Sequence, residues 1–401
     1  MNPWMKFLVW PLVKFLIAFV IVQVIVAAMN WIERRVLGLI QARRGPNRVG
    51  KEIGIPWGLG QILADPIKFL LKEDIVPSSA EKVAYFLGPM LPLVPTFLVY
   101  CLIPFGPGGS FIAARTNIAL LLILALTSTG VYGIILGGWA SNNKYSLMGG
   151  LRSAAQMVSY EVPFGLSIVG VLMICGSFDL TKIINYQANY VWNLFPQLVG
   201  AFIFFVSMNA ENNRTPFDLP EAESELVAGY HTEYSAMKFA FFMLAEYSAM
   251  LVNCCLMVSL YLGGWTLAVS GYGITSRVLL KMGMFGGIVG TLIFATKVMV
   301  FMMIYIWFRA TFPRFRFDQL MDLGWKWMIP LALGNIFVTA LVILGFGSRT
   351  VDGAMVWPGE IVLSVVGAAM LALTVFYITR KPVPRPSRPA KVMNASRVSE
   401  A

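Results

Sequence analysis

The chain has 401 residues, of which 58% are hydrophobic and only 13% are charged, and its formal net charge is +11. This much apolar material exceeds what the core of a soluble domain can bury, so the composition excludes an ordinary soluble protein. The positive charge comes without zinc-finger spacing or a basic recognition helix, so nucleic acid is not an expected partner.

Apolar segments follow one another along the chain, each close to the roughly 20 residues that cross a bilayer. They predict an all-α polytopic membrane protein with about nine transmembrane helices. The first segment is too long for a signal-peptide core and contains Lys14, so we expect it to be retained as a span. The expected spans are about 8–30, 83–104, 117–139, 158–177, 193–212, 237–262, 284–308, 328–346 and 358–379.

The spans divide the chain into three parts. We expect an eight-span core over residues 1–346, an additional transmembrane helix over 347–380 and a basic, Pro-rich cytoplasmic tail over 381–401. The composition of the tail is typical of a disordered or lipid-associated segment.

Lysine and arginine residues indicate the orientation. If the N-terminus lies outside, the inner connections and the tail together carry 22 of the 31 basic residues. Short basic loops remain cytoplasmic, so we expect the N-terminus on the outer side and the C-terminus inside.

The connection after the first span contains an expected amphipathic helix. Gln61, Asp65 and two lysines recur on one side at helical spacing, and apolar residues fill the other side. The pattern predicts a helix that lies along the membrane interface or against a partner protein, with Trp57 at head-group depth. Pro66 interrupts the pattern, so we expect the regular helix to begin near Asp65 as its cap.

Ionisable side chains at membrane depth suggest a function, because they are costly there unless they face water or a partner. Three carboxylates but only one lysine are expected at this depth. This excess of acids favours a hydrated proton path that opens to the inner side. The alternative is a set of structural ion pairs, such as Glu246 with Lys297, or Glu33 with Arg34 and Arg35. By the expected boundaries, the deep groups are Glu161, Glu211, Glu246 and Lys297.

Residues 210–234 form an acidic stretch, with six carboxylates and a single base, Arg214. Pro220, Glu221 and Glu223 fit the first turn of a short helix, where acids complement the helix dipole. That interpretation leaves the other acids unexplained. The four cysteines and the single histidine show no metal-ligand spacing, so electrons for any redox chemistry are expected from a different protein of a complex.

Five long motifs resemble one family in chain order. They are similar to the H subunit of the bacterial proton-pumping NADH:quinone oxidoreductase, whose mitochondrial counterpart is the first membrane-encoded subunit of respiratory complex I. The resemblance runs from residue 1 to about 345. The motifs are ERRVLGLIQARRGPNRVG (33–50), QILADPIKFLLKED (61–74), GWASNNKYSLMGGLRSAAQMVSYE (138–161), AENNRTPFDLPEAESELVAGYHTEYSAMKFAFFMLAEY (210–247) and RATFPRFRFDQLMDLGWK (309–326).

This resemblance implies a protein of the membrane arm that lies at the junction with the peripheral arm. Such a protein helps form the quinone-binding tunnel and the charged path that couples quinone reduction to proton pumping. The chain itself would bind no redox cofactor: quinone is the substrate, while NADH, FMN and iron–sulfur clusters belong to partner subunits. Other membrane and peripheral subunits of complex I and the lipid bilayer are the implied partners, and the bacterial inner membrane is the implied location.

Individual residues also receive expected roles. The expected proton path contains Glu33, Glu161, Glu211, Glu246 and Lys297. The expected quinone tunnel and the loop beside it contain Arg34, Arg35, Trp57, Asp65, Phe217, Asp218, Glu221, Glu223 and Glu225. Pro66 stands where the family more often has a small residue, which changes the expected shape of the interfacial helix.

Two other functions remain open at this point. In the first, the chain is the equivalent protein of a membrane-bound hydrogenase or of another donor:quinone complex. This alternative stays open because the chain does not encode the electron donor: GLG at 58–60 is too short for a dinucleotide loop. The second is a self-sufficient proton-coupled transporter, which would place its substrate between internal repeats. No such repeat is visible in the sequence.

Overall fold

The computed structural model of the chain describes residues 9–51, 54–108, 111–218, 227–267, 276–346 and 358–380. All regular secondary structure in these ranges is helical, which confirms the all-α prediction. The helices are α1 (Trp10–Ile40), η3 (Pro56–Gly58), α2 (Gln61–Leu71), α3 (Lys82–Val99), α4 (Ala119–Ser128), α5 (Gly130–Ala140), α6 (Lys144–Cys175), α7 (Leu180–Asn189), α8 (Leu198–Glu211), η5 (Gly229–His231), α10 (Ala236–Tyr261), α11 (Ser276–Lys281), α12 (Gly283–Thr311), α13 (Phe317–Asp322), η6 (Leu323–Met328), α14 (Ile329–Phe346) and α15 (Pro358–Arg380).

Each of the nine expected spans falls on a helix. In the described ranges, eight helical segments are long and apolar enough to cross a membrane, with α4 and α5 forming one of them and α13 to α14 another. The remaining expected span, 193–212, forms α8, which is apolar but has 14 residues. At about 1.5 Å per residue, α8 is shorter than the hydrocarbon core is thick.

Three helices begin or end elsewhere than expected. Helix α1 continues ten residues beyond the expected end, to Ile40, so Glu33 lies on a helix and not in a connection. Helix α6 begins at Lys144, well before the expected start at 158. The expectation that Pro66 delays α2 until Asp65 was wrong: the helix begins at Gln61 and contains the proline, because a proline in the second turn removes only one backbone hydrogen bond.

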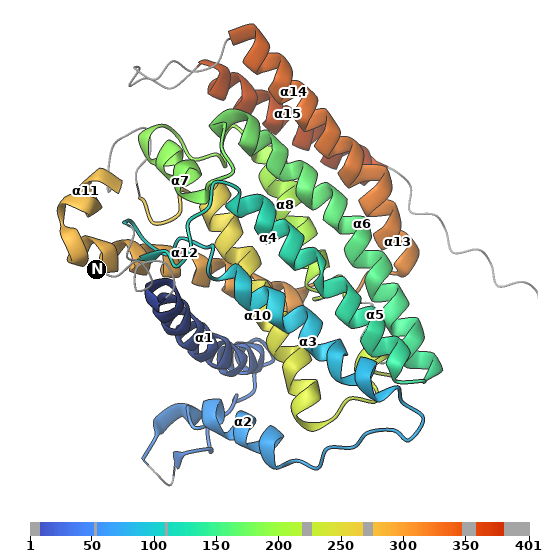
Figure 1. Cartoon of the computed structure of the whole chain (residues 1–401). Coiled ribbons are helices and arrows are strands. Elements are labelled where there is room, and N and C mark those ends of the chain that lie inside the picture. Colours follow the sequence, from blue (N-terminus) through green and yellow to red (C-terminus); the bar gives the residue numbers. More distant parts are fainter. Residues whose placement is uncertain are drawn as a thin grey trace, which may run out of the picture.

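Helix α10 forms the centre of the molecule and is the most buried of the candidate spans. It packs against α1, α3, α8 and α12, while α14 and α15 run beside each other along one edge (Figure 1). Small residues allow close packing elsewhere: a Cβ atom on Gly88 of α3 would lie 3.0 Å from the Gly137 Cα of α5. The short helix α2 lies outside this bundle, beside the end of α1 (Figure 1).

Candidate functional site

A cluster of charged side chains with a buried centre, Glu33 and Arg214, lies where α1, α10 and α12 meet the loop after α8. Arg214 donates from Nη1 to Glu33 Oε2 at 3.0 Å and from Nε to Glu246 Oε1 at 2.5 Å. Arg309 donates to the other carboxylate oxygen of Glu33. The Tyr247 hydroxyl donates to Glu33 Oε2 at 2.8 Å. We call these five residues the arginine–glutamate cluster.

The two cations of the cluster balance its two carboxylates. Arg214 and Glu33 are almost fully buried, which is tolerable only because each charge meets opposite charge and hydrogen-bond partners. Burial alone would lower the pKa of the Arg214 guanidinium, but Glu246 and Glu33 raise that pKa well above its ordinary value. The guanidinium also lies 4.2 Å from the centre of the Tyr247 ring. Arg214 therefore remains protonated and holds both acids in place.

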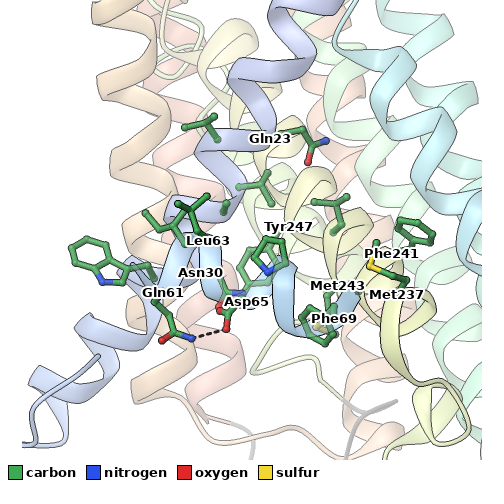
Figure 2. A pocket seen from close by; sticks show the side chains of 18 residues that line it. Gln23, Asn30, Gln61, Leu63, Asp65, Phe69, Met237, Phe241, Met243 and Tyr247 are labelled. Atoms are coloured by element: carbon green, nitrogen blue, oxygen red, sulfur yellow. Dashed lines mark hydrogen bonds between the residues drawn. The ribbon is translucent and has the colours of Figure 1, made fainter. Parts of the chain in front are cut away.

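An apolar pocket of about 410 Å³ lies beside this cluster, between α1, α2 and α10. Its volume is within the range of small-molecule sites. Figure 2 shows Gln61 and Asp65 of α2 at the pocket, with the Gln61 amide donating to Asp65 at 2.5 Å. The other lining residues are mainly apolar: Val24, Val26, Ala27, Trp31, Ile62, Leu63, Pro66, Phe69, Met237, Ala240, Phe241, Met243 and Leu244, with Gln23, Asn30 and Tyr247.

Tyr247 connects the pocket to the arginine–glutamate cluster. Its ring lines the pocket, and its hydroxyl donates to Glu33. A polar molecule at this end of the pocket is thus one side chain away from a buried carboxylate. Hydrogen bonds through one phenol can transmit a change of protonation between the two sites.

A second pair of acids, Glu161 and Glu211, lies near the first cluster and within electrostatic reach of each other. Asn253 donates to Glu211 Oε2 at 3.3 Å and to Asn212 at 3.4 Å. Asn212 in turn donates to the Tyr305 hydroxyl at 2.9 Å. In the described part of the chain, the partners of this pair are amides and hydroxyls, whereas the partners of Glu33 and Glu246 are arginines. Two such carboxylates are costly to keep ionised together, so protonation of one of them would stabilise the pair.

The start of the acidic stretch is firmly anchored. The fully buried Gln156 amide donates to the carbonyl oxygens of Ala210 and Phe217, at 2.8 and 2.7 Å. Asp218 accepts from Arg314 Nη2 at 2.8 Å, and Phe217 packs between Tyr160 and Phe315. The other acids of this expected site, Glu221, Glu223 and Glu225, lie outside the described residues.

Helix α2 is tied to the end of α1. Arg34 forms an ion pair with Asp65 at 3.3 Å. Arg35 donates to the Trp57 carbonyl at 2.8 Å, and the Trp57 ring is 65% exposed. Among the expected tunnel residues that the structure describes, Asp65 alone lines the pocket.

Lys297 is not brought to the acids. Its ammonium donates to three carbonyl oxygens after α10, those of Leu262, Gly264 and Thr266, at 2.6, 3.1 and 2.6 Å. The alternative pairing of Glu246 with Lys297 is therefore absent from the structure, where Glu246 pairs with Arg214. Glu33 likewise pairs with Arg214 and Arg309 and not with its neighbours Arg34 and Arg35.

Sequence reasoning missed Arg214, Arg309 and Tyr247 as site residues. One signal was available for Arg214, since it is the only base of the acidic stretch and buried acids need a cation. Arg309 stood at the inner end of a span, where a basic residue is ordinary. Tyr247 followed Glu246 within an apolar helix, where tyrosine is usually a packing residue.

Comparison with known proteins gives consistent matches over most of the chain. The family model described as NADH dehydrogenase matches residues 13–340. The NADH-quinone oxidoreductase H subunit (numbered 2) of Koribacter versatilis is 46% identical over 358 residues, covering 84% of this chain and 98% of that protein. The H subunit (numbered 1) of the Cytophaga hutchinsonii enzyme is 45% identical over 336 residues, covering 82% and 95%. The H subunit of the Bacillus cytotoxicus enzyme is 47% identical over 310 residues, covering 77% and 87%.

Proposed function

Because the chain belongs to the family of NADH-quinone oxidoreductase H subunits, we propose that it binds quinone and couples quinone reduction to proton pumping. Membership in the family makes it a multi-pass membrane component of an enzyme complex. The quinone and proton roles rest on the geometry of this chain.

The pocket between α1, α2 and α10 is the proposed quinone passage. Its wall is mainly apolar, as an isoprenoid tail requires, and its polar groups are few. Gln61, Asp65 and Tyr247 would orient the head group, with Arg34 holding Asp65 in place. Arg35, Trp57, Phe217 and Asp218 would shape the neighbouring loops, together with Glu221, Glu223 and Glu225.

The acids form the proposed coupling path. Reduction of a quinone consumes protons, so it changes the charge beside Tyr247 and hence the field at Glu33 and Glu246. The arginine–glutamate cluster would pass this change toward Glu211 and Glu161. These two acids have no basic partner among the described residues, which suits proton exchange. Lys297 would act only at a distance, because its ammonium is held by backbone carbonyls.

The remaining parts of the complex follow from the same proposal. Peripheral subunits would carry NADH, FMN and iron–sulfur clusters and would dock on the inner loops of this chain. The location would be the bacterial inner membrane, with the N-terminus periplasmic and the C-terminus cytoplasmic. Residues 1–346 would form the functional core, as the family match to residue 340 suggests. The helix at 358–380 and the tail at 381–401, which lies outside the described residues, would be additions.

The observation that carries this proposal is the double role of Tyr247, so we would change that residue first. The Tyr247→Phe variant keeps the ring in the pocket and removes the hydrogen bond to Glu33. We expect quinone-linked turnover to fall by roughly tenfold or more, at the scale of lost proton-relay contacts, while NADH oxidation by a hydrophilic acceptor remains unchanged. Tyr132→Phe is the matched control, because that side chain is 64% exposed on α5. Wild-type turnover and pumping in Tyr247→Phe would refute the link.

A further inference from the structure

A second cavity, of about 450 Å³, lies at the end of the bundle opposite α2. Five separate parts of the chain line it: the first turns of α1, the connection from α3 to α4, helix α7, Trp265 after α10, and helix α11. Helices α7 and α11 lie at this end in Figure 1. Its lining includes two cations, Lys14 and Arg115, and the neutral polar residues Thr181, Asn185 and Ser276. The proposed quinone function uses none of these residues.

Positive charge gathers around this cavity. The bias of basic residues places this end outside, where short connections are normally poor in lysine and arginine. Nevertheless Lys182 and Lys281, both exposed, directly follow the lining residues Thr181 and Leu280 in the sequence. Membrane topology therefore does not explain these cations, and an anionic ligand would.

The geometry of Arg115 leaves room for a second anion. Its Nε and Nη2 atoms donate to a single oxygen of Asp179, at 3.1 and 3.0 Å. The Arg115 side chain is 58% exposed, whereas that of Asp179 is buried. A guanidinium has five N–H groups, so the edge away from Asp179 can bind phosphate oxygens. Across the cavity, Lys14 Nζ donates to the Ile112 carbonyl at 3.2 Å, which holds the ammonium in the lining.

An apolar surface continues from the cavity along α1. Leu12, Leu16, Ile17 and Val20 are each at least half exposed. From Trp10 to Val20 the helix rises about 15 Å, or half of a hydrocarbon core of about 30 Å. Trp10 borders the cavity, where an aromatic side chain suits the membrane interface. The site thus combines a cavity that can bind an anion with an adjoining apolar helix surface as long as one leaflet of the bilayer.

We propose that this cavity binds the phosphate group of an anionic phospholipid. Lys14 and Arg115 contact the phosphate oxygens, and the acyl chains lie along the exposed face of α1. A free phosphate ion could contact the same two cations but would leave the apolar surface of α1 without a ligand. The proposal is independent of the quinone function.

The test is a binding titration on the delipidated, intact complex. Fluorescent phosphatidylglycerol and fluorescent phosphatidylcholine are added separately in detergent micelles to the wild type and to the double variant Lys14→Gln, Arg115→Gln. We expect one phosphatidylglycerol site per complex to weaken by about tenfold or more, since each basic residue at a membrane surface contributes several-fold to anionic lipid binding. Phosphatidylcholine binding stays unchanged.

Three controls make the outcome decisive. Lys326→Gln removes an exposed cation elsewhere and should leave phosphatidylglycerol binding intact, and Arg115→Lys should retain most of it. If the double variant does not assemble, Lys14→Gln alone should weaken the site several-fold. Equal phosphatidylglycerol affinity in wild type and variant would overturn the proposal. So would equal loss of both lipids, or displacement of the lipid by millimolar inorganic phosphate, which would indicate a free-anion site.

Discussion

At the scale of single residues, the two groups of buried acids differ in their partners. Glu33 and Glu246 are held by arginines, which favour their ionised forms. Glu211 is held by the neutral amide of Asn253. An amide accommodates a carboxylate or a carboxylic acid, so Glu211 is the better candidate for gaining and losing a proton during turnover.

Replacement of Glu211 tests this difference. Glutamine can keep the contact with Asn253 but cannot carry the exchangeable proton, so we expect Glu211→Gln to assemble normally. Proton pumping and quinone-linked turnover should fall together by about tenfold to a hundredfold. Both are measured in sealed vesicles, with Glu81→Gln as the control at an exposed position before α3. Pumping at the wild-type level in Glu211→Gln would remove the residue from the path.

At the scale of helices, the sequence predicted which segments are helical better than where they end. Apolar runs identify spans because the bilayer requires them. The end of α1 was misjudged because Glu33 and its neighbours look like loop residues until their partners on distant segments are known. Glu33 pairs with a residue 276 positions away, and no local pattern contains that information. Helix α2 was misjudged because proline was assumed to block a turn that tolerates it.

Helix α2 forms one wall of the proposed quinone pocket, and residues on both sides of it hold it in position. Before the helix, Arg35 binds the Trp57 carbonyl. After it, Asp74 pairs with the buried Lys238 at 2.8 Å, and the Ile75 amide donates to Ser235 at 3.0 Å. Ser235 directly follows the acidic stretch, and Lys238 lies in the first turn of α10. The start of α10 therefore holds the connection that follows α2.

Breaking the Asp74–Lys238 ion pair should disturb quinone binding. Asp74→Asn leaves the buried ammonium of Lys238 without its carboxylate, which favours a shift of the connection that positions α2. We expect the KM for quinone to rise several-fold, with kcat close to that of the wild type. Asp322→Asn is the control, because it breaks the exposed pair with Lys326, and such pairs contribute little. An unchanged KM in Asp74→Asn would show that α2 is positioned without this pair.

At the scale of the whole molecule, α2, which lines the proposed quinone pocket, lies at one end of the bundle, and α7 and α11, which line the cavity proposed to bind phospholipid, lie at the other (Figure 1). Membrane depth and the family resemblance together predicted Glu33, Glu161, Glu211 and Glu246 as a proton path, and that role stays a prediction. The resemblance predicted the family. It could not show that Tyr247 joins pocket to cluster, because that link needs three helices and a loop to meet in space. Nor could it show that Lys297 is turned toward backbone carbonyls.

Coupling to a peripheral arm requires that the end bearing the pocket and the cluster faces the cytoplasm. Translocating it would move most of the 31 basic residues across the membrane, so we expect Arg43 inside and Lys182 outside. With a membrane-impermeant maleimide, Lys182→Cys should be labelled in intact spheroplasts and Arg43→Cys only in inverted vesicles. The parent chain is the control for its own thiols, because Cys254 and Cys255 are buried but Cys101 and Cys175 are partly exposed. The reverse pattern would place the pocket and the acidic stretch outside, where cytoplasmic subunits cannot reach them, and would refute the proposed coupling.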